Sequence, residues 1–262
     1  MHRYVILLVS SILFVLTLIP QGSYALGLEA GVGYVRHEPS GHLAYKPLSS
    51  VDKLDIERDL GYDREDRPFA RLKAEMPLFF PNIYLFATPV KFEETGSKTG
   101  NFTFGDISFD VTVPFDSKIQ MDLYDVCLLY PLPFLDKATL GKINAEIGLN
   151  ARIVDFEAEI SGRDAITGLT ATESVKEIIP VPMIYAAIQL NPVDFLSIET
   201  EGRGVVYSSN HYYDVIGRIK IKPAGPFFIA AGYRHNDIKI DYGDIEASIK
   251  LSGPFVESGV IF

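Results

Sequence analysis

The sequence predicts an all-β fold, a transmembrane antiparallel up-and-down β-barrel of about ten strands within a range of roughly 8 to 12. The first observation is strict alternation over residues 143–153, where every second side chain is apolar and those between are polar or small. A segment of this kind is a strand with one apolar and one polar face. It lasts long enough for a tilted membrane strand, which needs about 9 to 11 residues.

The same alternation predicts each strand in chain order, with clear repeats over residues 26–34, 70–76 and 215–222. A soluble sandwich also alternates, with its apolar face inward, so alternation alone leaves sandwich and barrel both open. The strands are expected at residues 26–36, 67–76, 82–95, 118–131, 142–159, 175–190, 193–208, 211–222, 226–241 and 245–262.

The connections are the second observation, and they favour the barrel. Those after the second, fourth, sixth and eighth strands are compact and rich in Pro, Gly and Asn, as turns are. At the other end, residues 37–66 and 160–174 are long and polar, residues 96–117 are long and mixed, and the last two connections are short. Short periplasmic turns and longer outer loops are typical of a membrane barrel.

Aromatic side chains near the Pro-rich turns predict a lower girdle at the membrane interface. Ordinary core aromatics are the alternative for any single position. The lower girdle would contain Phe79, Phe80, Phe134, Phe195, Phe227, Phe228 and Phe262, and the upper one Tyr207, Tyr212, Tyr213 and Tyr233.

The first 25 residues predict a cleaved signal peptide, followed by one barrel domain over residues 26–262. A basic start ending at Arg3, an almost wholly apolar stretch over residues 4–20 and a small-residue site at Ala25 are its three parts. The rival is an uncleaved anchor, because the apolar stretch is at the lower limit for spanning a bilayer. We therefore expect secretion across the inner membrane to the bacterial outer membrane.

Composition excludes two classes. The formal net charge of −10 argues against a nucleic-acid partner, since nucleic acid binds basic faces. The only cysteine, Cys127, excludes an intrachain disulfide and is most simply a small apolar residue on a strand.

Residues 63–84 (DREDRPFARLKAEMPLFFPNIY) resemble a family of small, functionally unassigned Gram-negative outer-membrane β-barrel proteins with a C-terminal Phe. Residues 122–125, 231–234 and 253–254 resemble the same family, and Phe262 resembles the terminal aromatic of outer-membrane barrels in general. The resemblance implies a barrel in the outer membrane. It further implies that Phe262 is an assembly signal read by the barrel-assembly machinery, and it carries no catalytic residues.

Ionisable residues lie on the polar faces of the predicted strands and would face the lumen of a barrel. Two interpretations are open: an ion-paired plug in place of a hydrophobic core, or a narrow path for ions or small solutes. Barrels of about eight strands are filled by side chains, which favours the plug, and buried charges would then need partners. The expected lumen residues are Glu29, Arg71, Lys73, Glu75, Glu146, Arg152, Arg218, Lys220 and Arg234.

The first outer loop is acidic, with Asp55, Glu57, Asp59, Asp63, Glu65 and Asp66. The spacing of Asp55, Glu57 and Asp59 is similar to the start of a calcium-binding loop, but Gly61 falls one place later than the EF-hand turn requires. A solvated loop is the simpler reading, and we expect no cofactor and no metal site. A looser hypothesis is that the loop shares divalent cations with lipopolysaccharide phosphates.

Histidines near the predicted outer rim raise the question of catalysis, which needs an activated nucleophile or water within hydrogen-bond reach. His211 and Asp214 are expected on opposite faces of a strand. His235 and Asp237 share a face, but no matching Ser stands out in the sequence. We therefore expect no catalytic residues and no enzyme.

Together these observations predict a structural protein or a narrow small-solute or ion pore. Its partners would be outer-membrane lipid, and its outer loops would contact lipopolysaccharide or external ligands. Two alternatives remain open: an outer-membrane rim enzyme acting on lipid or peptide, and a soluble periplasmic barrel that binds an apolar ligand inside.

Overall fold

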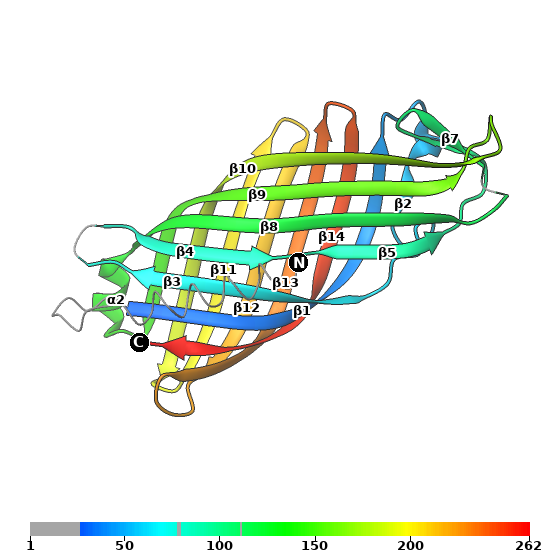
Figure 1. The fold of residues 1–262 in the computed structure, drawn as a ribbon. Helices are drawn as coiled ribbons and strands as arrows, with labels where there is room; N and C mark the ends of the chain where they lie inside the picture. Colours follow the sequence, from blue (N-terminus) through cyan, green and yellow to red (C-terminus); the bar gives the residue numbers. More distant parts are fainter. Residues whose placement is uncertain (1–26, 78–79, 111) are drawn as a thin grey trace, which may run out of the picture.

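The protein is a closed antiparallel β-barrel of ten strand positions (Figure 1). The structure, a computed structural model, describes residues 27–262 except 78, 79 and 111, so the predicted signal peptide lies outside the described residues. The barrel closes where β14 pairs with β1, and neighbouring strands otherwise follow chain order. The predicted fold class and strand number are therefore confirmed.

The ten wall positions have the following bounds. They are β1 (Gly27–Tyr45), β3 (Glu65–Glu75), β4 (Asn82–Thr88) continued by β5 (Lys91–Gly96), β8 (Phe115–Pro131), β9 (Ile143–Arg163), β10 (Thr170–Val193), β11 (Leu196–Tyr207), β12 (Asn210–Ile221), β13 (Phe227–Tyr242) and β14 (Ile245–Ile261).

The two ends of the barrel differ, as Figure 1 shows. The C-terminus and α2 (Pro133–Thr139) lie at one end, which we call the turn end. At the other, the outer end, β1 runs nine residues past its predicted limit. There η1 (Ser50–Asp52) and β2 (Leu54–Asp55) follow it. None of the helices in the described part of the chain is long and apolar enough to cross a membrane.

The predicted loop 96–117 contains a hairpin, β6 (Phe102–Phe104) and β7 (Ile107–Phe109), which forms a sheet of its own. Its aromatic side chains are buried; the Phe102 ring stacks on Phe109 at 5.5 Å and lies 5.0 Å from Phe115. This hairpin packs into the apolar interior of the outer end, so the segment is part of the core and not a free loop.

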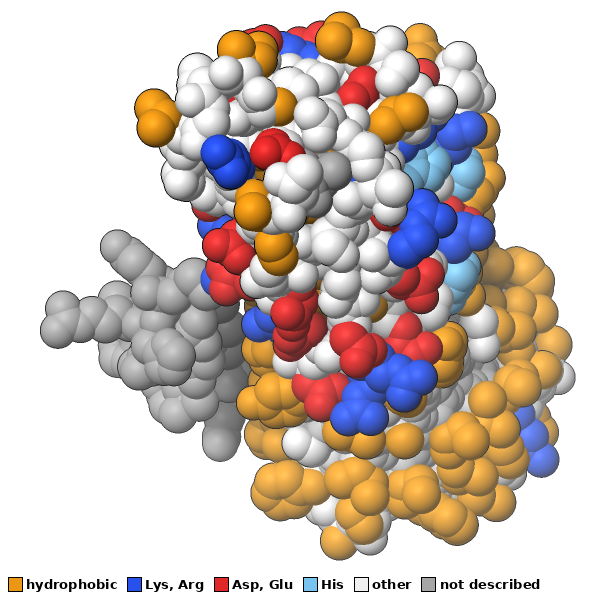
Figure 2. Space-filling view, turned by 90° about the vertical axis from the view of Figure 1, so that its right-hand side faces the viewer, with side chains coloured by type: hydrophobic (Ala, Val, Ile, Leu, Met, Phe, Trp, Pro, Cys, Tyr) orange, Lys and Arg blue, Asp and Glu red, His pale blue; other side chains and the backbone are white. Residues whose placement is uncertain are grey.

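The outward-facing side chains change from apolar to polar at one point along most strands. Below that point they form an exposed apolar band, in which Leu149 is 68% and Val256 62% exposed. Figure 2 shows these side chains gathered over the lower part of the molecule, with charged ones over the rest. The change falls between Tyr34 and Arg36, Pro68 and Asp66, Tyr124 and Asp122, Ile153 and Asp155, Ile178 and Lys176, Tyr213 and His211, Tyr233 and His235, and Pro254 and Ser252.

The interior changes in the opposite sense. Inside the outer half the side chains are apolar and form one buried cluster that includes Ile56, Leu60, Phe156 and Ile249. Inside the half that carries the apolar band, many are charged, among them Arg71 and Glu257. The outer half thus has an apolar interior and a polar surface, like a water-soluble β-protein. The half with the apolar band, which we call the banded half, has charged side chains inside and apolar side chains outside.

Candidate functional site

The lumen of the banded half holds seven cationic and seven anionic side chains, each in at least one ion pair. The formal charge of this set is therefore zero. Its cations are Arg71, Lys73, Arg152, Arg203, Arg218, Lys220 and Arg234, and its anions are Glu29, Asp125, Glu146, Glu199, Glu201, Asp214 and Glu257. We call these fourteen residues the lumen network.

The part of the network nearer the turn end joins strands across the barrel seam. Arg71 on β3 donates to Glu257 on β14 at 2.5 Å and also pairs with Glu29 on β1. Lys220 on β12 reaches the same Glu29 carboxylate at 2.7 Å, and Arg218 Nη1 lies 3.2 Å from Glu257. Each carboxylate here serves two cations from different strands, so the pairs tie the barrel walls together.

The part further from the turn end centres on Asp214. Its carboxylate accepts hydrogen bonds from Arg234 at 2.8 and 3.0 Å and from Arg152 at 2.5 Å. Arg152 also donates twice to Asp125 at 2.7 Å, and Arg203 Nη1 lies 3.2 Å from the same carboxylate. Three guanidinium groups and two carboxylates thus share one buried cluster, drawn from β8, β9, β11, β12 and β13.

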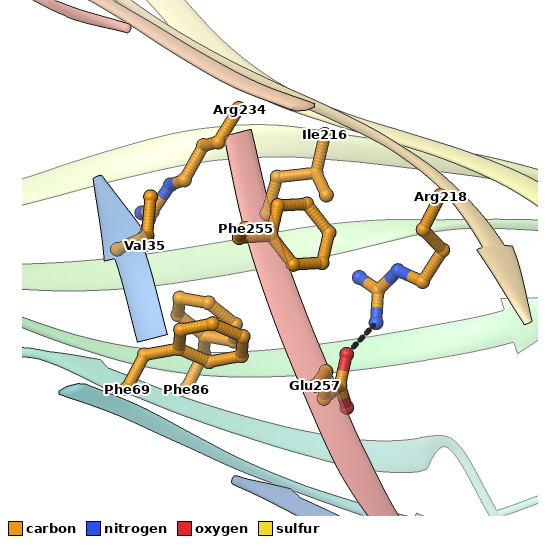
Figure 3. Close-up of a pocket in the computed structure, with 8 residues that line it drawn as sticks. All are labelled: Val35, Phe69, Phe86, Ile216, Arg218, Arg234, Phe255 and Glu257. Carbon is orange, nitrogen blue, oxygen red and sulfur yellow. Dashed lines mark hydrogen bonds and ion pairs between the residues drawn. The ribbon is translucent and has the colours of Figure 1, made fainter. Parts of the chain in front are cut away.

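Aromatic rings lie between the two parts, which the Arg203–Glu201 ion pair at 3.5 Å also joins. Figure 3 shows Phe255 between Arg234 and Arg218, with Phe69 and Phe86 beside it. The Arg234 guanidinium lies 4.8 Å from the centroid of the Phe86 ring. These residues line a cavity of about 10 Å³, which has room for about one water molecule. Side chains therefore fill the lumen at this level.

Arg203 has three buried guanidinium nitrogens without a hydrogen bond, although they lie 3.2 to 3.7 Å from the carboxylates of Asp125, Glu201 and Asp214. Its guanidinium lies 5.2 to 5.7 Å from the ring centroids of Phe86, Tyr84 and Tyr185. Cation–π attraction in this desolvated site stabilises the Arg203 guanidinium, whose nitrogens make no hydrogen bond. Both tyrosine hydroxyls donate to Glu201, at 3.2 and 2.7 Å, so β4 and β10 also join the network.

Of the nine ionisable residues expected in the lumen, eight lie in the lumen network and Glu75 is exposed near the turn end. Six members were missed by the sequence analysis: Asp125, Glu199, Glu201, Arg203, Asp214 and Glu257. The alternation of polar side chains over residues 197–203 was the signal that could have found three of them. Asp214 was considered only with His211, from which it points away.

In the acidic outer loop, Asp59 is paired with two cations. Asp59 accepts from Lys98 Nζ at 2.6 Å and from Arg58 Nε at 3.1 Å. Burial raises the pKa of Asp59, but hydrogen bonds from Lys98, the Asp55 backbone and Arg58 outweigh it and hold that pKa below its ordinary value. Within the described ranges, no group of three or more His, Cys, Asp or Glu side chains is placed to hold a metal ion.

The outward face beyond the apolar band carries polar pairs between neighbouring strands. His211 Nε2 lies 3.2 Å from Asp237 Oδ1, and Lys250 Nζ lies 3.6 Å from the other oxygen of that carboxylate. His235 Nδ1 lies 2.6 Å from Ser252 Oγ. Ser252 was missed because it is on the next strand, and only the register of β13 against β14 brings it to His235.

The aromatic girdles are partly as expected. Phe80, Phe134, Phe195, Phe227 and Phe262 are exposed at the turn end, and Tyr207, Tyr213 and Tyr233 are exposed further out, whereas Phe79 lies outside the described residues. The prediction was wrong for Tyr212 and Phe228, whose side chains alternate inward and lie under Arg152 and beside Arg71. The backbone of Phe262 exchanges hydrogen bonds of 2.8 and 3.0 Å with Leu28, and its role in assembly stays a prediction.

No family model matches the chain, and no curated protein matches it. Among solved structures it is similar to Ail, the attachment invasion locus protein of Yersinia pestis, crystallised with the heparin analogue sucrose octasulfate (10% identity, TM-score 0.36, 91% of this chain and 100% of that chain). It is also similar to the monoaromatic hydrocarbon channel CymD (8%, 0.33, 92% and 89%) and to the P. putida toluene transporter TodX (7%, 0.26, 91% and 90%). At these identities and scores, the matches say nothing about what this chain binds or does.

Proposed function

We propose that the protein is an integral protein of the bacterial outer membrane, anchored by a sealed barrel and presenting a folded outer half to lipopolysaccharide or external ligands. The observation that carries this proposal is the double change of polarity. Apolar side chains face outward where the lumen is charged, and charged ones face outward where the interior is apolar. Lipid around the first half and water around the second account for both arrangements.

The height of the apolar band supports a bilayer as its surroundings. It covers about eight residues per strand, which at a rise of about 3.4 Å and a tilt of about 40° gives roughly 20 Å. Membrane barrels have an outward apolar band about 25 Å tall. A soluble barrel would leave this face in water, so the periplasmic ligand-binding alternative is not favoured.

The lumen network supports an anchor over a pore. Its seven cations and seven anions are paired with one another, and the neighbouring cavity has room for about one water. An ion entering this lumen would have to break buried pairs, which is costly. We therefore place the function in the outer half, with the barrel-assembly machinery reading Phe262 during insertion.

The outer half is the acidic part of the molecule. Residues 27–262 contain 34 acidic and 23 basic side chains; the lumen network holds seven of each sign and the turn end three of each. The remaining 24 acidic and 13 basic side chains therefore place the whole charge of −11 on the outer half. Such a surface favours cationic partners, or contact with lipid phosphates through divalent cations.

Spin labels on β14 test this placement. In a Cys127→Ser background, a label at Val256 should be accessible to oxygen dissolved in lipid, and a label at Lys250 to a water-soluble nickel chelate. Both positions face outward on one strand, so they form a matched pair. Equal access of the nickel chelate to both labels in reconstituted vesicles would contradict the proposal.

A further inference from the structure

We propose that Ser252 and His235 form an acyl-hydrolase site on the outer wall of the barrel, acting on ester-linked lipids of the membrane around it. The Ser252 hydroxyl lies 2.6 Å from Nδ1 of His235. A nucleophile within hydrogen-bond reach of a base is the geometry that activates serine for attack on a carbonyl. No residue of the lumen network takes part, because both side chains face outward.

The position of the pair along the strands selects the substrate. Three successive outward-facing pairs on β13 and β14 are Tyr233 with Pro254, His235 with Ser252, and Asp237 with Lys250. The first pair ends the apolar band, and the third is charged. The carbonyl of an acyl ester lies between the hydrocarbon chains and the polar headgroups of a lipid, which is the level of the second pair.

The neighbours fit the two ends of such a lipid. Toward the turn end the outward surface is apolar, with Tyr233 and Val256 half exposed, and half-exposed Val215 lies beside His235 on β12. All three side chains are free to contact an acyl chain. Toward the outer end, the half-exposed side chain of Lys250, whose ammonium group lies 3.6 Å from Asp237, is at the level of a headgroup phosphate. In Figure 2 the histidine side chains gather on one flank of the outer half, the lowest of them close to the apolar band.

Ser252 lies next to a gap in the pairing of β14 with β1. Between the pairs Val35–Phe255 and Glu38–Ser252 the β1–β14 ladder loses two rows, and Pro254 has no N–H to donate there. Gly253 lets β1 approach closely, because a Cβ at this position would lie 1.6 Å from the Arg36 carbonyl oxygen. Gly253 and Pro254 therefore determine the backbone position of Ser252 next to this gap.

The atoms and protons of the reaction balance with these two residues, lipid and water. Ser252 Oγ attacks the ester carbonyl carbon while His235 takes the hydroxyl proton. The bond to the lipid alcohol breaks, and that alcohol oxygen receives the proton from His235. Water, giving its proton to His235, then attacks the acyl-serine. The carbon–Oγ bond breaks, Ser252 regains the proton, and the fatty acid is released.

Fatty-acid release from the full-length barrel in mixed micelles tests the proposal, with two lipid probes in separate arms. One arm contains phosphatidylethanolamine with labelled acyl chains, and the other contains lipopolysaccharide; release in either arm identifies the source of the ester. Ser252→Ala and His235→Ala should each lower release by at least about 100-fold. Ser248→Ala, an outward-facing serine of the same strand, should leave it unchanged.

Covalent labelling gives a readout that does not depend on the lipid chosen. A fluorophosphonate probe should form an adduct on Ser252, and His235→Ala should slow this labelling. Folding of every variant is checked by its unheated migration on a gel. Release that persists in Ser252→Ala overturns the proposal, and so does a folded wild-type protein that neither releases fatty acid from either lipid nor labels at Ser252.

Discussion

Asp214→Ala is expected to lower the free energy of unfolding by about 3–5 kcal/mol, the usual cost of removing one partner from a buried ion pair. The substitution leaves Arg234 without the carboxylate that accepts both of its ionic hydrogen bonds. Arg152 and Arg203 would retain Asp125 but face an unpaired guanidinium. The measurement is urea unfolding in lipid vesicles, with the loss of the unheated gel form as a second probe.

Two variants make this result specific to the network. Glu75→Ala removes a carboxylate that is exposed at the turn end and should change the free energy of unfolding by less than about 0.5 kcal/mol. Asp214→Asn keeps an acceptor but loses the charge, so its effect should fall between the other two. A loss in Asp214→Ala no greater than in Glu75→Ala would mean that the lumen network does not stabilise the barrel.

Phe102→Ala is expected to cost about 3–5 kcal/mol in the outer half, the range for truncating a buried Phe. The ring is buried between Phe109 and Phe115, and its loss should loosen the β6–β7 hairpin. Because the lumen network lies in the other half, the half with the apolar band should keep its strand pairing. Limited proteolysis on intact vesicles should therefore cut within residues 97–114 and leave the rest of the barrel protected.

The control for this variant is Leu48→Ala, which truncates an outer-end side chain that is already exposed. It should leave the protease pattern of the wild type unchanged. Cleavage throughout the barrel in Phe102→Ala would instead show that the two halves unfold as a single unit.

The wall of the barrel could be predicted from the sequence because alternation is a local property. Strand β9 shows this most clearly, since every second side chain from Ile143 to Ile153 faces outward. The same rule pointed to Arg71 and Lys73 on β3 and to Arg218 and Lys220 on β12, whereas Glu75 on β3 is exposed and Asp214 on β12 was missed. The turns were also readable, although the fourth connection contains a short helix, α2.

The contacts between strands could not be predicted in this way, because they depend on register across the closed barrel. Asp214 meets Arg152 over a separation of 62 residues, and Ser252 meets His235 over 17. The apolar interior of the outer half was missed for a second reason. Strands in the outer half alternate as they do in the banded half, but their apolar face points inward and their polar face outward. The pattern alone does not say which face is inside.

Conductance in planar lipid bilayers tests the central claim most directly, because a barrel sealed by a neutral, paired lumen network passes no steady current. The wild-type protein should insert, as shown by its unheated gel form recovered from the bilayer lipids, and should give no current steps. A general porin in the same bilayer serves as the positive control. Reproducible single-channel steps from the folded wild-type protein would show that an ion path crosses the lumen and would contradict the account.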